Sequence, residues 1–207
     1  MSDRSTRAMR RPVIGRRIRP LQQGDLDGRC GVYAIINAIR HLCPEVGTER
    51  ARELFIAMML ARHELALRRP LVFVYDGLGR RPLTALANAA IEHLAHTAGI
   101  DIEVEWLAPA KGGRSSLPTL WRKLSAHIGS TGIAIVGLAG RTSHWTVVID
   151  ITCKQMRLLD SDGLSVLRRS RCSPRPGAHH HSIEPGNILL VRRLGRSDSA
   201  SAIELLV

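Results

Sequence analysis

The hydrophobic periodicity of this chain changes near residue 130, and that change limits the folds open to it. Before it, apolar residues recur at helical spacing in four segments. After it, short apolar runs alternate with turns that contain glycine, serine and aspartate, which is typical of hairpins. The pattern therefore predicts an α+β fold, with N-terminal helices packed on a C-terminal antiparallel sheet.

The expected elements follow from the apolar spacing and the turn residues. Helices are predicted from Cys30 to before Pro44, from Thr48 to about residue 65, from Pro82 to Gly99, and over residues 117–128. Strands are predicted over residues 71–75, 100–107, 132–139, 144–150, 154–160 and 188–194. Residues 168–186, rich in proline, arginine and histidine, are expected to form an irregular surface loop.

The length and charge of the chain limit its organisation and its partners. A chain of 207 residues suits one domain, which we expect over residues 20–195, between an Arg-rich arm (1–19) and a tail (196–207). A net charge of +12 would suit nucleic acid or another anionic surface. All but three of the basic residues are arginines, however, which is typical of a GC-rich bacterial genome. Charge-driven binding is therefore not the favoured function, although the arm remains a candidate for it.

The cysteines and the apolar runs indicate the cellular compartment of the protein and whether it holds a metal cofactor. The four cysteines form no C-x-x-C pair, which favours free thiols in a reducing compartment. The N-terminus lacks the apolar middle of a secretory signal, and no apolar run is long enough to span a membrane. We therefore expect a cytoplasmic protein, with delivery by a specialised secretion system left open. No cofactor is expected, because Cys153, Cys172 and His179–His181 match no standard zinc spacing.

The most informative stretch, Gln22–Ala38, reads QQGDLDGRCGVYAIINA. Cys30 stands where the first helix begins, and backbone N–H groups and the helix dipole favour a thiolate there. The apolar stripe that follows indicates a buried helix, so this end would be anchored rather than frayed. Cys30 is thus a candidate nucleophile, although a buried cysteine is more often an inert core residue.

A nucleophilic thiol needs a base, a group that orients the base, and donors for the oxyanion. His144 opens one predicted strand and Asp160 ends the next, so a hairpin would bring them side by side. Asp162 is a lesser alternative, because a Ser-Asp-Gly turn explains it without catalysis. The side-chain amide of Gln23 and the backbone N–H of Cys30 are the candidate oxyanion donors.

Two segments resemble active-site motifs of papain-like cysteine peptidases. QQGDLDGRCGVYAIINA resembles the Gln…Cys-Gly segment of ubiquitin-like (SUMO-type) deconjugating proteases, and HWTVVIDITCKQMRLLDSDG resembles their His-Trp strand and Asp-Ser hairpin. The order Gln, Cys, His, Asp is that of papain and of bacteriocin-leader peptidases instead. The resemblance covers about forty residues. It implies a papain-like fold in one catalytic domain.

The resemblance assigns roles residue by residue. It implies Cys30 as nucleophile, His144 as base, Asp160 as its orienter and Gln23 as oxyanion donor. Trp145 matches the family's tryptophan near the cleft. Gln23 precedes the cysteine by seven residues where the family usually has six, so Gln22 is an alternative.

Gly31, directly after the nucleophile, is expected to keep the substrate cleft narrow and unobstructed. The expected activity is therefore that of a thiol peptidase or isopeptidase with a protein substrate. The resemblance implies a ubiquitin-like conjugate or a Gly-Gly-type site. The alternatives are a papain-fold acyltransferase of transglutaminase type and a non-catalytic basic binding module.

Overall fold

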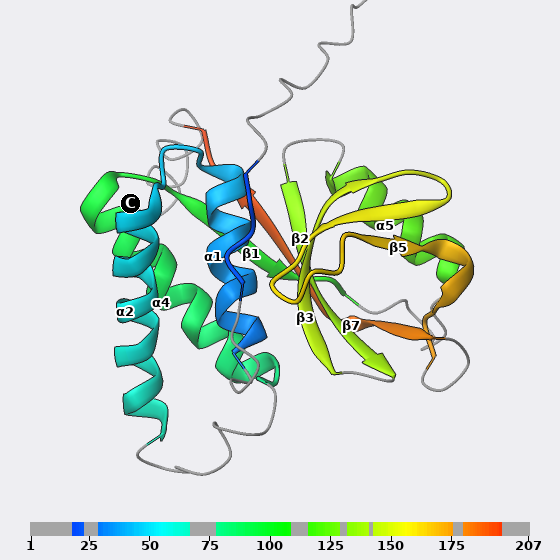
Figure 1. Ribbon diagram of the computed structural model, residues 1–207, viewed down its shortest axis with the longest axis horizontal. Helices are drawn as coiled ribbons and strands as arrows, with labels where there is room; N and C mark the ends of the chain where they lie inside the picture. The colour runs from blue at the N-terminus through cyan, green and yellow to red at the C-terminus, as the bar shows by residue number, and fades with distance from the viewer. Residues whose placement is uncertain are drawn as a thin grey trace, which may run out of the picture.

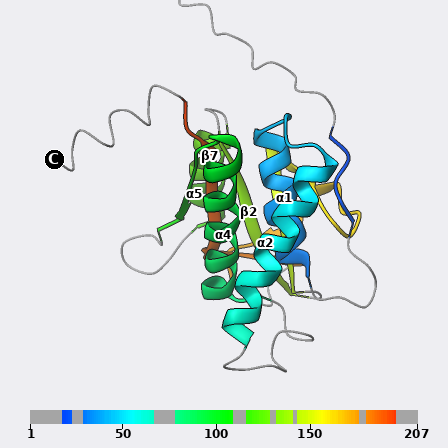
Figure 2. The same cartoon turned by 90° about the vertical axis from the view of Figure 1, so that its left-hand side faces the viewer.

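The described part of the chain forms three layers, with a central sheet that has three helices on one face and one helix on the other. In the computed structural model, α1, α2 and α4 cover one face of the sheet and α5 covers the other (Figure 1). Figure 2, turned by 90°, shows α1, α2 and α4 side by side in front of the sheet. The structure describes residues 18–22, 29–66, 78–108, 116–128, 132–140, 143–175 and 180–195.

The described helices lie close to their predicted positions. They are α1 (Cys30–Leu42), α2 (Thr48–Ala66), α4 (Arg80–Ala98) and α5 (Leu117–Ile128). Gly99 ends α4 as predicted, because it adopts a left-handed conformation (φ +59°) and its N–H bonds to the carbonyl of Ala95. Pro82 lies in the first turn of α4, where its missing N–H has no intrahelical partner to lose.

The sheet is antiparallel apart from one short parallel contact. Its strands are β1 (Ile102–Trp106), β2 (Gly132–Gly140), β3 (His144–Ile151), β4 (Gln155–Leu159), β5 (Val166–Arg168), β6 (Cys172–Ser173) and β7 (His181–Arg193). The strand order is β1-β7-β2-β3-β4-β5, with β6 parallel to β7. With helices packed on this sheet, the predicted α+β class is confirmed.

Two apolar cores lie on opposite faces of the sheet, as strand alternation requires. On β2, Ile133 and Ile135 face the core with α1 and α4, whereas Ala134 and Val136 face α5. Because β2 is buried on both faces, its run of apolar residues is nearly continuous. Apolar packing of α1 on β2 and β3 fixes the position of the helix that begins with Cys30.

The expected loop over residues 168–186 is wrong in most of its described part. β5 ends at Arg168, β6 follows at Cys172, and β7 begins at His181 rather than at Ile188. β7 pairs with β2 along its length, and the register shifts between Val136 and Leu138. This shift bends the pairing around residues 184–187, so the alternation that identifies a strand is broken there.

Several sequence expectations fall outside the described residues. These are the strand at 71–75, the glycine-containing loop at 110–115, most of the Arg-rich arm, and the tail after residue 195. The division into arm, domain and tail therefore stays a prediction. Among the described helices, none is long and apolar enough to cross a bilayer.

Two isoleucines test how far stability depends on the burial of α1. Ile36 in α1 is 1% exposed, and Ile56 in α2 is 57% exposed. Ile36→Ala should lower the free energy of unfolding by about 2–5 kcal/mol, because it removes buried methyl groups and leaves a cavity. The matched control Ile56→Ala should change it by about 0.5 kcal/mol or less. Urea unfolding followed by circular dichroism measures both, and equal effects would contradict the packing described for α1.

Candidate active site

Cys30 is the first residue of α1 and is 5% exposed. The residue that follows it, Gly31, is packed tightly. A Cβ at this glycine would lie 2.8 Å from Cδ1 of Leu78 and 2.9 Å from Cδ1 of Leu83. The structure thus gives Gly31 a packing role instead of the open flank expected from sequence. A larger residue at this position would require the two leucine side chains to shift.

His144 and Asp160 lie together at one end of the β3–β4 hairpin. His144 begins β3, and Asp160 directly follows β4. Val147 pairs with Leu159, so continuing this register places Asp160 opposite Thr146 and diagonal to His144. Nε2 of His144 lies 2.7 Å from Oδ2 of Asp160, and the two side chains are 11% and 1% exposed.

The thiol of Cys30 reaches the same place from the helical layer. The His144 ring hydrogen-bonds with the Cys30 thiol. Since Asp160 occupies Nε2, the ring nitrogen on the thiol side is Nδ1. The backbone N–H of Trp145 also donates to Sγ of Cys30 over 3.5 Å. The structure therefore joins a thiol, an imidazole and a carboxylate through consecutive hydrogen bonds.

The charges of this group favour a protonated imidazole. Burial alone would lower the pKa of His144, but the hydrogen bonds and negative charges of Asp160 and Cys30 outweigh it and raise the pKa to about 10. Burial would raise the pKa of Asp160, but the hydrogen bond from His144 and the charge of that ring lower it. Asp160 is thus held ionised beside an imidazolium.

Two backbone donors fix the second oxygen of the Asp160 carboxylate. Oδ1 accepts the N–H of Asp162 at 2.8 Å and that of Leu164 at 3.1 Å. Asp162 was the alternative partner for the histidine, but its side chain is exposed in the turn and His144 bonds to Asp160. The Ser-Asp-Gly turn instead provides a backbone N–H that holds the aspartate in place.

Trp145 connects the sheet to the segment before α4. Its indole N–H donates to the carbonyl of Leu78 over 2.6 Å, and its ring lies edge-on to Trp106 at 6.2 Å. A Cβ at Gly137 would lie 3.0 Å from this indole, so a glycine on β2 makes room for it. Trp145 is 7% exposed, so it supports the site from beneath more than it lines a surface. Sequence reasoning did not find Leu78, because the contact joins two layers distant in sequence.

Asn37 is a second residue that sequence reasoning missed. It is fully buried in α1, and its amide bonds to both backbone groups of Leu21, at 2.8 and 3.1 Å. It therefore anchors the chain one residue before Gln22, whose side chain is exposed. Gln23 lies outside the described residues. A buried asparagine on an apolar helical stripe was the available signal, because such a group needs partners.

The other cysteines have different surroundings. Cys43 and Cys172 are buried, and desolvation by burial raises the pKa of each thiol to about 11. Cys153 is exposed. Among the described residues, no three side chains of His, Cys, Asp or Glu cluster as metal ligands would. Within that part of the chain, Cys30 is the thiol that bonds to an imidazole.

Comparisons with known proteins add little to this geometry. No protein-family model and no curated protein matches the chain. Among solved structures, the crystal structure of the Pseudomonas avirulence protein AvrPphB is similar over 79% of this chain and 91% of that one. The identity is 13% and the TM-score is 0.37, a likeness too low to support an argument about activity. Inferences about function therefore rest on the residues and contacts described above.

The environment of His144 can be tested by titration. Asp160→Asn removes the carboxylate, so the pKa of His144 should fall toward its ordinary value. In the wild type the raised pKa contributes stability that is complete below about pH 6.5 and is lost as pH rises toward about 10. NMR of the His144 ring carbon against pH measures the change. The control Asp150→Asn alters an exposed carboxylate of β3 and should leave the His144 titration unchanged. Equal curves for wild type and Asp160→Asn would contradict the pairing.

Proposed function

We propose that the chain is a cysteine peptidase or isopeptidase with a papain-like fold, acting on a protein substrate. The observation that carries the proposal is His144, whose ring lies between the Cys30 thiol and the Asp160 carboxylate. A thiol beside a carboxylate-oriented imidazole is the arrangement needed to make and release an acyl-enzyme. The α+β layers, with a helix that presents the cysteine to a hairpin that holds the histidine, support the papain-like assignment.

The reaction follows from these contacts. The Cys30 thiolate adds to the carbonyl carbon of the substrate amide, and the carbonyl oxygen becomes an oxyanion. The C–N bond then breaks, and the imidazolium of His144 gives its proton to the leaving amine, which leaves a thioester on Cys30. Neutral His144 next takes a proton from water as the water oxygen attacks the thioester. The carboxylic acid product departs, and the thiolate–imidazolium pair is restored.

Asp160 and the helix terminus support these steps. Asp160 holds Nε2 of His144, so Nδ1 stays directed at the sulfur and the imidazolium is stabilised. The oxyanion would be stabilised by the backbone N–H of Cys30 at the start of α1 and by a glutamine side chain, Gln23 or Gln22. No metal or organic cofactor enters this scheme. The motif resemblance favours a ubiquitin-like conjugate or a Gly-Gly-type site as substrate.

The reactivity of Cys30 is tested by iodoacetamide labelling at pH 6, with each cysteine followed by mass spectrometry. We expect Cys30 to be alkylated before the exposed Cys153, because most ordinary thiols are protonated at that pH. His144→Ala should slow labelling of Cys30 about tenfold or more and leave Cys153 unaffected. Labelling of Cys153 ahead of Cys30 would contradict the proposal. An equal rate of Cys30 labelling in the wild type and in His144→Ala would contradict it too.

A ubiquitin electrophile separates the general proposal from its substrate. Ubiquitin with a C-terminal vinyl sulfone, a Michael acceptor, in place of the carboxylate should form an adduct on Cys30. If iodoacetamide selects Cys30 and this reagent does not, the peptidase proposal stands and the ubiquitin-type substrate is wrong.

The two glutamines are distinguished by mutation. If Gln23 donates to the oxyanion, Gln23→Ala should lower kcat about 100- to 1000-fold, and Gln22→Ala should have little effect. The rate is measured on a peptide that the wild type cleaves from a chymotrypsin-generated peptide pool. The reverse result assigns the role to Gln22, and an unchanged kcat in both variants would contradict a glutamine oxyanion donor.

A further inference from the structure

Arginines occupy the N-terminal ends of α1 and α4, where the helix dipole favours acidic residues. Arg29 immediately precedes α1, and Arg80 and Arg81 begin α4. Neither helix has an acidic residue in its first turn. The positive end of a helix dipole is an unfavourable place for a cation, so these three arginines do not serve helix stability.

The segment before α4 connects Arg80 to the surroundings of the proposed nucleophile. Leu78 contacts both sides of the site: its carbonyl accepts the Trp145 indole N–H, and its side chain closes the space beside Gly31. Arg80 follows two residues later, within about 7 Å of Leu78 along the backbone. The start of α4, which carries Arg80, therefore adjoins the segment that packs beside Gly31, the residue after Cys30.

A contact with an aromatic ring holds the Arg80 side chain in position. Its guanidinium carbon lies 4.5 Å from the centroid of the Trp106 ring, and Trp106 in turn meets Trp145 edge-on. The Trp106 indole N–H donates to Thr84 over 2.9 Å, which fixes the ring. A stacked guanidinium keeps its N–H groups directed outward, where they can bind a carboxylate in bidentate fashion. Arg80 is thus an exposed cation that is already ordered.

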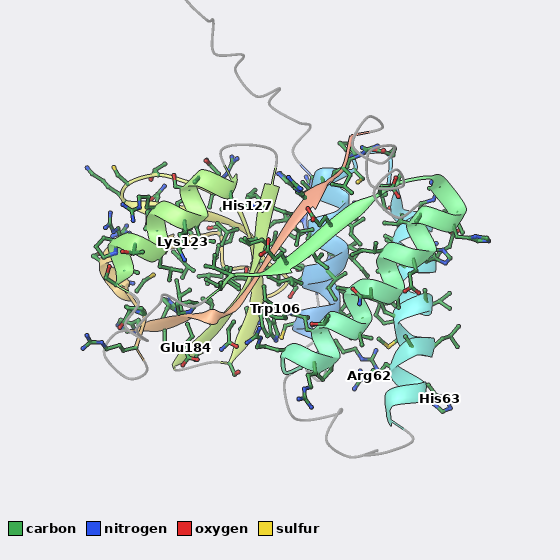
Figure 3. The ribbon with its side chains drawn as sticks, turned by 180° about the vertical axis from the view of Figure 1, so that it is seen from behind. Arg62, His63, Trp106, Lys123, His127 and Glu184 are labelled. Carbon is green, nitrogen blue, oxygen red and sulfur yellow. The ribbon has the colours of Figure 1, made fainter. Side chains whose placement is uncertain are left out.

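Further positive charge lies at the same end of the helical layer. Burial, and then the charge of Arg29, lower the pKa of Arg62 in α2. Figure 3 shows Arg62 near the end of α2 on the side of α4, whereas His63 points outward. Within the described ranges, no ion pair joins Arg29, Arg80 or Arg81 to an acidic residue. Glu184, the acid nearest in sequence to the Gly186 backbone beside Arg80, accepts a hydrogen bond from Asn187 instead.

We propose that Arg80, together with Arg29 and Arg81, selects protein substrates that carry aspartate or glutamate within a few residues of the scissile bond. This inference rests on the proposed peptidase function and names its substrate class. The acidic side chain would pair with the Arg80 guanidinium, which forms no ion pair with an acid in the part of the chain that the structure describes. A neutral or basic flank would offer no negative charge to the Arg80 guanidinium.

Two alkylating reagents test how Arg80 affects the electrostatic potential at the Cys30 sulfur. This test does not require the substrate to be known. Iodoacetate and iodoacetamide share the same reactive carbon, but only iodoacetate carries a carboxylate. Arg80→Glu should lower the iodoacetate-to-iodoacetamide rate ratio at Cys30 about tenfold, because it reverses one charge near the thiol. The difference between the variants should shrink in 1 M NaCl, where charges are screened within about 3 Å.

Two controls separate charge from structure. Arg80→Lys keeps the charge but loses the planar stacking group, and it should retain most of the wild-type ratio. Arg122→Glu makes the same charge change on the exposed side of α5, across the sheet from α1, and should leave the ratio unchanged. An unchanged ratio in Arg80→Glu, or an equal fall in Arg122→Glu, would overturn the inference.

Peptide electrophiles test the substrate class itself. We compare peptidyl vinyl sulfones with glutamate, glutamine or lysine at each of the three positions before the reactive group. The glutamate series should label the wild type fastest, and the lysine series should label Arg80→Glu fastest. Equal rates for all three series would overturn the inference while selective iodoacetamide labelling of Cys30 leaves the peptidase proposal intact. If no reagent selects Cys30, both proposals fail.

Discussion

The bond between His144 and Asp160 is the contact on which the site depends. Asp160 accepts two backbone N–H groups on Oδ1, so Oδ2 has one fixed position from which to hold the imidazole. Because the carboxylate is 1% exposed, its charge is poorly screened and strongly favours the protonated ring. The turn that follows β4 is therefore part of the site, because the backbone N–H groups of Asp162 and Leu164 hold the carboxylate. A buried carboxylate without these donors would cost far more than it contributes.

The layers of the fold bring the helical side of the site to this hairpin. α1 packs through its apolar face on β2 and β3, and this packing delivers the Cys30 thiol to the ring of His144. Trp145 links the sheet to the helical layer, because its backbone N–H donates to Sγ of Cys30 and its indole N–H donates to the carbonyl of Leu78. The same tryptophan links the site to Trp106 and Arg80. Catalytic geometry and substrate charge preference would thus depend on one aromatic cluster.

The contacts predictable from sequence were those set by local pattern. The apolar stripe after Cys30 located α1, and two alternating runs around a short turn placed His144 near Asp160. The long β7 was missed because its irregular register around residues 184–187 breaks the alternation, and its pairing with β2 is a tertiary effect. The roles of Leu78 and Asn37 could not be read from spacing, because each acts on a backbone group that only the folded chain brings near. Gly31 looked like a cleft residue, but two leucines fill the space beside it.

The central claim is that Cys30 forms a thioester with its substrate, and trapping that intermediate tests it most directly. The protein is mixed with a chymotrypsin-generated peptide pool, quenched in acid within milliseconds and digested for mass spectrometry. The expected result is a peptide acyl group on Cys30 that neutral hydroxylamine removes, as it removes thioesters, and that is absent from His144→Ala. An acyl group on another cysteine, a hydroxylamine-stable adduct, or no adduct on Cys30 would contradict the claim.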